Sequence, residues 1–409
     1  MLKIYLCDFV HNYLGLGTYM FPLNIGCLAA YAKKAFPAET DISLFKYPED
    51  FIARCKEVSP QIAGFSNYTW NADLNKRVSG WLKGVLPDTL VVFGGPNIDL
   101  YPQGYIKFFT NYKAADCYVP YQGEAPFANI LREVLGSDRQ MSRLGRRSIE
   151  GVVSYDRANA TLSVGSSLPH IKDLDALPSP YLSGTLDKFF DTALIPIMET
   201  NRGCPYGCTF CAQGENSRHQ ISFFDLRRVK DELSYIARRV KNTNILNFAD
   251  SNFGIAARDK QIAGYIARLA KETGYPRKFN TNWAKGRPAI AEIAQILPDS
   301  SLIISLQSLD RKVLRNIKRS NSSTAGFRKL IRQINLNGGI SATELILGLP
   351  GESKESHLNA LRRLFKWGVA QITCYNGLLL QGTQMSLQRE MGKTDYRTKY
   401  RLIDNSFGR

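Results

Sequence analysis

Short apolar runs separated by longer amphipathic stretches dominate the first third of the chain. The runs are four or five residues long and predict strands, whereas the stretches between them have the spacing of helices. Strands are predicted at residues 3–7, 42–45, 62–66 and 90–93, and helices at residues 23–35 and 71–86. Apolar strands that alternate with helices predict a parallel sheet covered on both faces. Residues 1–135 are therefore expected to form a doubly wound, Rossmann-like α/β domain.

The same alternation returns after residue 195. Strands are predicted at residues 195–199, 245–248, 278–280, 302–306, 341–347 and 371–375. One helix between them should begin behind Asp225, a good N-cap residue, because apolar side chains follow at helical spacing: Leu226, Leu233 and Ile236 among them. Six strand–helix units predict a partial (β/α)6 barrel over residues 196–385, with its chemistry at the carboxyl ends of the strands.

Two segments fall outside these alternations. Residues 136–195 are expected to be a connector that contains a small hairpin (residues 151–155 with 161–164) and a proline-bearing approach to the barrel at residues 174–181. Residues 386–409 are expected to be the start of a C-terminal extension. The chain would then comprise two α/β domains, a connector and the beginning of a further segment.

Three cysteines carry the strongest chemical signal. Cys204, Cys208 and Cys211 have the spacing C-x3-C-x2-C on one short loop that also holds three glycine or proline residues. A structural zinc site requires four ligands, as does a cubane cluster that only carries electrons. Three thiolates would leave one iron of a cubane open to a ligand. Zinc with a distant fourth ligand such as His219, and simply buried thiols, are the alternatives.

The loop resembles the signature of the radical S-adenosylmethionine (SAM) superfamily, including an aromatic residue, Phe210, before the third cysteine. The resemblance implies a [4Fe–4S] cluster whose open iron is chelated by SAM. It also places further SAM contacts on the strand ends: Asp250 and Asn252 after the second strand, Gln307, Ser308 and Arg319 after the fourth, and Glu344 and Gly348 on the fifth. The alternatives are a turn or cap residue for Asp250 and a surface charge for Arg319.

The loops of the first domain carry a second resemblance. They end predicted strands with polar, aromatic and glycine residues: Ser66, Tyr68, Trp70 and Asn71, then Gly94, Gly95 and Pro96, then Gly123 and Glu124. A doubly wound domain with such loops in front of the cysteine motif is similar to the cobalamin-binding domain of cobalamin-dependent radical SAM enzymes. The Asp-x-His-x-x-Gly loop that supplies a lower cobalt ligand elsewhere is absent, because His11 follows Asp8 by three residues. A cobalamin bound here is expected to lack a histidine below the cobalt.

Composition and net charge narrow the classes of protein to which the chain can belong. The chain has 409 residues, of which 44% are hydrophobic, enough for a hydrophobic core of ordinary size. Eight cysteines in this length are too few for a fold held together by disulfides. It has no apolar run long enough to span a bilayer and no signal-peptide pattern, and we expect it to be soluble and cytoplasmic. The net charge of +17 indicates an acidic partner or a solvated basic surface. Nucleic-acid binding is disfavoured, because the basic residues are spread out and no recognition module is present.

Together the two resemblances imply a cobalamin-dependent radical SAM enzyme. The leading interpretation is a methyltransferase that acts on an unactivated carbon through a 5′-deoxyadenosyl radical and methylcobalamin. A cyclase or rearrangement enzyme with the same cofactors, a methylthiotransferase-like radical SAM enzyme and a non-catalytic cofactor-binding sensor are the alternatives. The substrate is expected to be a small molecule or a peptide, and an external electron donor of flavodoxin or ferredoxin type is expected. No catalytic side chain is assigned from the sequence.

Overall fold

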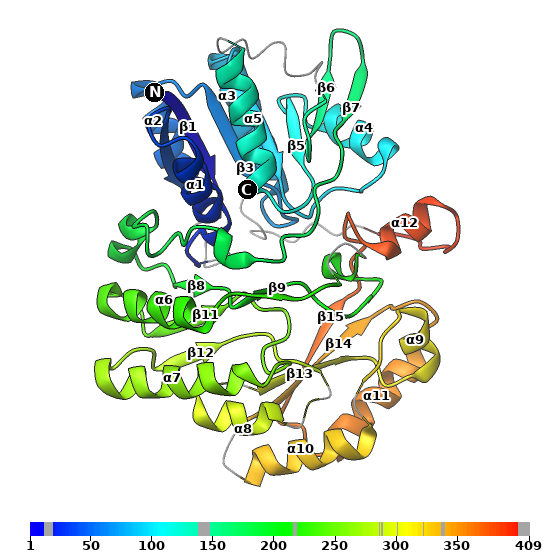
Figure 1. Cartoon of the computed structure of the whole chain (residues 1–409). Helices are drawn as coiled ribbons and strands as arrows, with labels where there is room; N and C mark the ends of the chain where they lie inside the picture. The colour runs from blue at the N-terminus through cyan, green and yellow to red at the C-terminus, as the bar shows by residue number, and fades with distance from the viewer. Residues whose placement is uncertain are drawn as a thin grey trace.

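The computed structural model of the chain places two α/β parts against each other (Figure 1). It describes residues 1–11, 19–137, 148–215, 219–285, 287, 289–300, 302–321, 323–336 and 340–399. The last ten residues of the predicted C-terminal extension lie outside this set. Among the described residues no helix is both long and apolar enough to cross a membrane.

A seven-stranded sheet forms the first part, in the order β2-β1-β3-β4-β5-β6-β7. The first five strands are parallel: β1 (Leu2–Cys7), β2 (Thr40–Phe45), β3 (Ile62–Ser66), β4 (Leu90–Gly94) and β5 (Cys117–Val119). The predicted hairpin of the connector is present as β6 (Val153–Asp156) and β7 (Thr161–Val164), and it extends this sheet in antiparallel fashion. Strand order reverses between β1 and β3, which is where open α/β sheets bind ligands.

Helices cover both faces of this sheet, as the continuous apolar strands predict. Along β1, Ile4 and Leu6 face a core formed with α1 (Leu23–Ala35) and α5 (Glu124–Gly136). Tyr5 and Cys7 face a second core on the other side. That core is formed with α2 (Pro48–Glu57), α3 (Ala72–Val85) and α4 (Pro102–Asn111). The doubly wound prediction is confirmed.

Six parallel strands form the second part, as predicted for a partial barrel. They fall into two groups of three: β8 (Ile197–Met198), β11 (Ile245–Phe248) and β12 (Lys278–Asn280), then β13 (Leu302–Gln307), β14 (Ser341–Leu347) and β15 (Gln371–Asn376). A bridge between Phe279 and Ser300 connects the groups. The helices that accompany the strands are α6 (Leu226–Arg239), α7 (Arg258–Thr273), α8 (Ala289–Ile296), α9 (Arg311–Asn316), α10 (Thr324–Leu336) and α11 (Lys354–Lys366). A last helix, α12 (Gln384–Glu390), follows β15.

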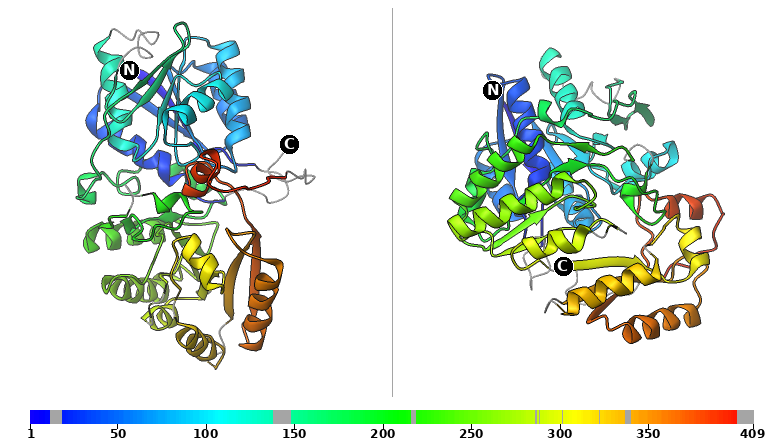
Figure 2. Two further views of the ribbon diagram at one scale, coloured as in Figure 1. Left: turned by 90° about the vertical axis from the view of Figure 1, so that its right-hand side faces the viewer. Right: turned by 60° about the horizontal axis from the view of Figure 1, so that its bottom comes forward.

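The two parts share one hydrophobic core. The segment before β8 contributes Tyr181, Phe189 and Phe190, whose rings pack on Phe21, two residues before α1 begins. The same core continues through α6 to the barrel strands. Figure 2 shows the two parts in close contact from two further directions. The carboxyl ends of β1 and β3 to β5 therefore lie directly opposite the loop that follows β8.

Candidate functional site

A cavity of about 970 Å³ lies between the two parts, at the carboxyl ends of the parallel strands of the first sheet. Eight of the nine residues predicted for cobalamin line it: Ser66, Tyr68, Trp70, Gly94, Gly95, Pro96, Gly123 and Glu124. The barrel closes its other side with residues that include Gly203, Gln213 and Ser251. Gly203 directly precedes the first cysteine of the loop, so the cavity reaches the cysteine loop.

Asn71, the ninth predicted residue, lies behind the wall of the cavity. Its side-chain nitrogen donates to the Phe9 carbonyl at 3.3 Å and to the Ser66 hydroxyl at 3.4 Å. Its side-chain oxygen accepts from the Tyr68 amide at 2.9 Å. The structure thus gives Asn71 a positioning role toward two residues that do line the cavity.

The β4 loop needs glycine for a reason internal to the fold. Gly95 has a φ of +127°, and a Cβ there would lie 2.7 Å from the Asn67 carbonyl oxygen. The glycine therefore lets the loops after β3 and β4 pack closely. Beside them the rings of Tyr68 and Trp70 stack at 4.4 Å with an interplanar angle of 8°, and Trp70 stays 41% exposed. The pair presents a broad, flat aromatic surface, which suits a large planar ligand.

A charged group at the base of the cavity was not among the predicted site residues. Asp8 follows β1 and accepts hydrogen bonds from Lys46 at 2.7 Å, Ser66 at 2.5 Å and Asn24 at 3.1 Å. Burial by itself would raise the pKa of Asp8, but the Lys46 charge and these hydrogen bonds lower it below the ordinary value. All four side chains line the cavity. The position of Asp8 directly after a strand was the available sequence signal, but its partners lie up to 58 residues away.

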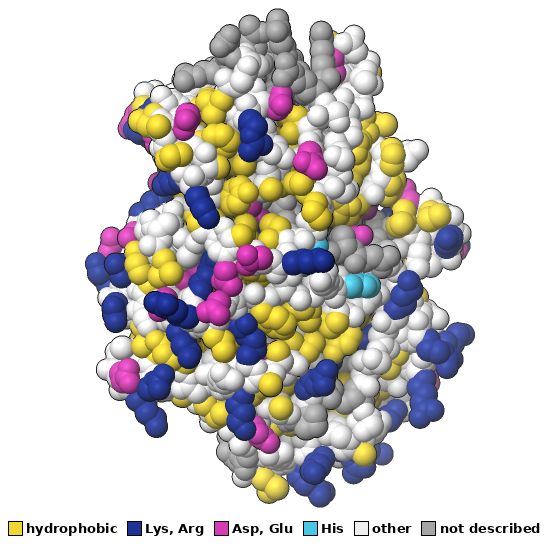
Figure 3. Space-filling model, in the orientation of Figure 1, with side chains coloured by type: hydrophobic (Ala, Val, Ile, Leu, Met, Phe, Trp, Pro, Cys, Tyr) yellow, Lys and Arg dark blue, Asp and Glu magenta, His cyan; other side chains and the backbone are white. Residues whose placement is uncertain are grey.

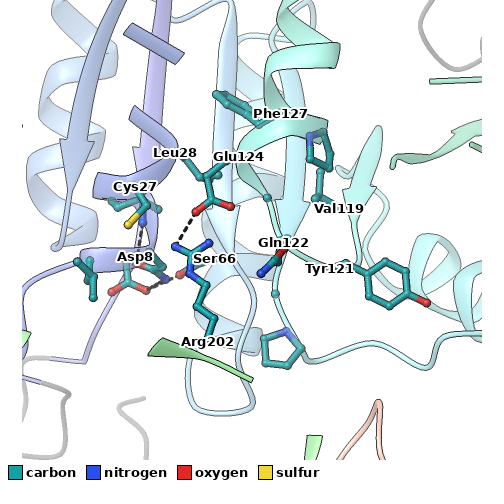
Figure 4. A pocket seen from close by; sticks show the side chains of 18 of the residues that line it. Asp8, Cys27, Leu28, Ser66, Val119, Tyr121, Gln122, Glu124, Phe127 and Arg202 are labelled. Atoms are coloured by element: carbon teal, nitrogen blue, oxygen red, sulfur yellow. Dashed lines mark hydrogen bonds and ion pairs between the residues drawn. The ribbon is translucent and has the colours of Figure 1, made fainter. Parts of the chain in front are cut away.

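An ionic contact joins the two parts at the cavity wall (Figure 4). Arg202 of β9 (Asn201–Arg202) reaches Glu124, at the start of α5, at 2.8 Å and Glu199 at 2.6 Å. Burial opposes the charge of Arg202, but the two carboxylates raise the pKa of its guanidinium well above the ordinary value. Arg202 lies two residues before Cys204, so the contact ties the cysteine loop to the first domain.

One histidine among the described cavity residues is His170 of the connector. Its Nε2 lies 3.0 Å from the Ser222 hydroxyl, and burial together with the charges of Arg202 and Lys172 lowers its pKa. His11 is described but is not part of the lining. The loop after β1 thus contributes Asp8 and no histidine to the cavity.

The cysteine loop folds back on itself through backbone contacts. The Cys211 amide donates to the Cys208 carbonyl at 3.1 Å, and the Gly214 amide donates to the Cys211 carbonyl at 2.9 Å. A Cβ at Gly214 would lie 2.2 Å from the Cys208 oxygen, so only glycine fits there. Cys204 and Cys208 are buried, and burial raises the pKa of the partly buried Cys211.

Cationic and amide groups surround these sulfur atoms. Asn252 donates to the Cys204 sulfur at 3.2 Å, and Lys285 and Arg319 approach the Cys208 sulfur at 3.7 and 3.9 Å. Burial lowers the pKa of both Lys285 and Arg319. Such donors suit a cluster whose thiolates carry negative charge and whose open iron binds a carboxylate ligand. Lys285 was missed in the sequence, because it follows a short strand without a recognisable motif.

The loop fits a cubane better than a zinc ion. His219, the fourth ligand considered for zinc, directs its Nε2 toward the Gly214 carbonyl at 3.2 Å, which requires that nitrogen to donate. In the described part of the chain no group of three or more His, Cys, Asp or Glu side chains is gathered so as to hold one metal ion. In a cubane each thiolate binds a different iron, and such a gathering is not expected.

Some of the residues predicted to bind SAM contact the cysteines or have a buried side-chain oxygen without a partner in the described part of the chain. Asn252 and Arg319 contact the cysteines, and the Asn252 side-chain oxygen is buried without a hydrogen-bond partner among the described residues, as is the side-chain oxygen of Gln307. Gln307 also has a φ of +64°, which is rare for a residue with a side chain. Buried acceptors of this kind are available to a ligand.

The remaining predicted SAM residues have partners within the protein. Asp250 accepts from the Thr200 amide at 2.7 Å and its hydroxyl at 2.5 Å, and burial raises the pKa of Asp250 to about 7. Glu352 accepts from the Ser308 hydroxyl at 3.4 Å and the Gly348 amide at 3.0 Å. Glu344 accepts from Ser305 at 2.5 Å, and Phe210 packs on α9.

Two family models match the chain in the order of its two parts. The B12 binding domain matches residues 14–131, and the Radical SAM superfamily matches residues 198–364. Both fall on the parts that hold the cavity loops and the cysteines.

Two curated relatives are methyltransferases. The cobalamin-dependent radical SAM methyltransferase TokK from Streptomyces tokunonensis is 31% identical over 375 residues, which are 87% of this chain and 53% of TokK. The 2-(S-pantetheinyl)-carbapenam-3-carboxylate methyltransferase from Streptantibioticus cattleyicolor is 30% identical, with the same shares covered. The chain thus spans about half the length of these relatives.

A solved structure extends the likeness of fold over nearly the whole chain. The radical SAM methyltransferase TsrM from Kitasatospora setae, with cobalamin and a [4Fe–4S] cluster bound, covers 98% of this chain and 76% of its own with a TM-score of 0.72. Its sequence identity is 15%, so this comparison supports only the fold of the chain.

Proposed function

Because the chain belongs to the radical SAM superfamily and carries a B12 binding domain in front of the radical SAM core, we propose that it is a cobalamin-dependent methyltransferase acting on an unactivated carbon. The observation that supports this most is the shared cavity. Its sheet side is lined by the loops expected to hold cobalamin, and its barrel side by Gly203, next to Cys204. A corrin in this cavity would lie beside the cysteine loop, as a reaction that uses both cofactors requires.

We assign residues to the cluster, to SAM and to the corrin from their positions in the structure. Cys204, Cys208 and Cys211 hold the cluster, and Asn252, Lys285 and Arg319 surround it and the SAM that binds there. Tyr68, Trp70 and the Gly94–Pro96 loop contact the corrin, while Asp8 and Lys46 form the polar base of its site. When bound, the cluster supplies the electron that cleaves SAM, and cobalamin supplies the methyl group. The protein holds these groups and excludes water.

The domain boundaries at residues 135, 195 and 385 are part of this proposal, as is a cytoplasmic location. The substrate is proposed to be a small molecule, since one of the relatives is named for a carbapenam carboxylate. Glu344, which Tyr375 contacts at 3.4 Å between adjacent barrel strands, stays a proposed SAM contact.

The test begins with anaerobic reconstitution of iron, sulfide and hydroxocobalamin, followed by metal analysis and incubation with SAM and a reductant. About four irons and one cobalt per chain are expected, with both 5′-deoxyadenosine and S-adenosylhomocysteine released from SAM when substrate is present. Cys208→Ser should lose iron and keep cobalt. Cys55→Ser, which alters a buried thiol of α2, should keep both.

Other outcomes identify the alternatives. About eight irons without cobalt would indicate a methylthiotransferase-like enzyme. Release of 5′-deoxyadenosine with no S-adenosylhomocysteine would indicate a rearrangement or cyclisation. Both cofactors bound with no cleavage of SAM would remove the enzymatic proposal and leave a sensor.

A further inference from the structure

The short helix α9 has two opposite faces. Val313 and Ile317 are buried, whereas Arg311, Lys312 and Arg315 are exposed and together form what we call the α9 basic face. None of these three cations forms an ion pair with a described residue. The first turn of α9 is capped by Asp310, which accepts from the Lys312 and Val313 amides, so the three cationic side chains are not needed to cap the helix.

The buried face of α9 packs on the cysteine loop. The Thr209 amide donates to the Ile317 carbonyl at 3.1 Å, and the Phe210 ring packs against an apolar cluster made of Val313, Ile317 and Leu349. Both residues lie between the second and third cysteines. One helix thickness, about 10 Å, therefore separates the α9 basic face from the cysteine loop.

Acidic groups near α9 already have partners, one of them buried and the other at the surface. Glu352 is buried beside His357 at 3.3 Å, and Glu355 pairs with Arg362 at 2.9 Å. Figure 3 shows Lys and Arg side chains gathered along the edge of the barrel where Figure 1 places α9 and α11, with few Asp or Glu side chains among them. The surface over the cysteine loop is thus strongly positive, and its charges are available to a partner.

We propose that the α9 basic face docks an acidic, low-potential electron-transfer protein of the flavodoxin or ferredoxin type. The inference rests on the proposed function, which requires one electron per SAM cleaved from outside the chain. That electron leaves the reduced cofactor of the donor and passes to the cluster; an anionic flavin hydroquinone becomes the neutral semiquinone in this step, and no proton is released. Charge complementarity would steer the donor to the side of the barrel from which the path to the cysteines is one helix thick.

Direct binding provides the decisive readout. The probe is a purified bacterial flavodoxin, and its dissociation constant is measured by surface plasmon resonance at low and high ionic strength. The variant is Arg311→Glu, Lys312→Glu and Arg315→Gln combined. Glutamate in the first turn of a helix is favourable, and the substitutions touch no buried contact, so the fold should persist. The matched control is Arg268→Glu, Lys271→Glu and Arg277→Gln, which makes the same charge change on and beside α7, away from α9 in Figure 1.

The variant should raise the dissociation constant about tenfold or more at low ionic strength and should lose most of the salt dependence, whereas the control should behave like the unmodified protein. SAM cleavage driven by flavodoxin should fall in the variant, while cleavage driven by dithionite should be unchanged. Equal affinity in the variant and the control would overturn the docking proposal. The docking proposal would also be overturned if the variant lost binding to a tRNA probe but bound flavodoxin as tightly as the unmodified protein. If dithionite supports no cleavage in any protein, the proposed function fails, while the binding result still decides the docking site.

Discussion

The Asp250 carboxyl group shows how a residue can be important to the site without touching a ligand. It is 1% exposed and receives both hydrogen bonds that Thr200 can donate. Thr200 lies just after β8, four residues before Cys204, so the pair holds the strand end from which the cysteine loop departs. The interpretation of Asp250 as a turn or positioning residue is favoured over direct contact with SAM.

This burial predicts a pH dependence of stability. The pKa of Asp250 is about 7 in the folded chain, against an ordinary value of 3.8, so the folded state holds a proton that the unfolded state has lost in that window. Its contribution to stability is therefore present at low pH and is lost as the pH rises through about 7. Asp250→Asn cannot ionise. It keeps both contacts if its side-chain oxygen accepts from the Thr200 amide and its side-chain nitrogen donates to the Thr200 hydroxyl. The melting temperature of the apoprotein should fall less between pH 5.5 and 8 in this variant than in the unmodified chain.

Glu57→Gln serves as the comparison, since Glu57 is exposed and its partner Arg54 is also at the surface. If the melting temperatures of Asp250→Asn, Glu57→Gln and the unmodified chain all depend on pH in the same way, Asp250 is ionised throughout this range. The prediction of a neutral, buried Asp250 would then be wrong.

Residues of the site were predictable from sequence where a motif fixes the spacing, as for the three cysteines, or where a loop ends a strand, as for Tyr68 and Gly95. Asp8 and Arg202 were not predicted, because their roles depend on charged partners that are far away in the sequence. Lys46 is 38 residues from Asp8, and Glu124 is 78 residues from Arg202 (202 minus 124). A buried charge can be interpreted only when its counter-charge is known.

At the scale of elements, the contact between β9 and α5 positions the two cofactor sites. Glu124 is 5% exposed at the first turn of α5, where the helix dipole also favours a carboxylate. Glu124→Gln would leave Arg202 paired with Glu199 and remove the ionic part of the link to the first domain, leaving at most a neutral hydrogen bond. We expect a cost of about 1–3 kcal/mol at this contact and correspondingly weaker cobalamin retention.

The measurement is cobalt and iron per chain after gel filtration of the reconstituted protein. Glu124→Gln should retain less cobalt at unchanged iron, whereas Glu355→Gln, which breaks the exposed pair with Arg362, should retain both. Equal loss of iron and cobalt would mean that the contact stabilises the whole fold rather than the corrin site.

Elements were predicted best where they are long and apolar. The predicted strands at residues 3–7, 62–66 and 90–93 agree with β1, β3 and β4 to within one residue at each end, and α1 has the predicted bounds. Strand β5 has only three residues and β8 only two, too few to show a period, and the hairpin β6–β7 joins the first sheet through pairing that no local pattern encodes.

At the scale of the whole molecule, the cavity belongs to neither part alone. The connector also lines it through Leu168, Pro169, His170 and Ile171. A ligand that fills it must therefore stabilise the sheet, the connector and the barrel together. Binding to the folded chain alone raises its stability by an amount set by ligand concentration, about 2.7 kcal/mol at one hundred times the dissociation constant.

Hydroxocobalamin should therefore raise the melting temperature of the metal-free chain and protect the connector from proteolysis. Protection near His170 distinguishes the shared cavity from a site on the sheet alone, because a ligand held only by the β3 and β4 loops would leave the connector as accessible as before. Limited trypsin digestion with mass spectrometry of the fragments provides the readout, and cleavage after Lys172 is the informative event. A higher melting temperature with unchanged cleavage after Lys172 would confine cobalamin to the first domain and separate it from the cysteine loop. Protection of Lys172 would place the corrin in the cavity that the sheet and the barrel share.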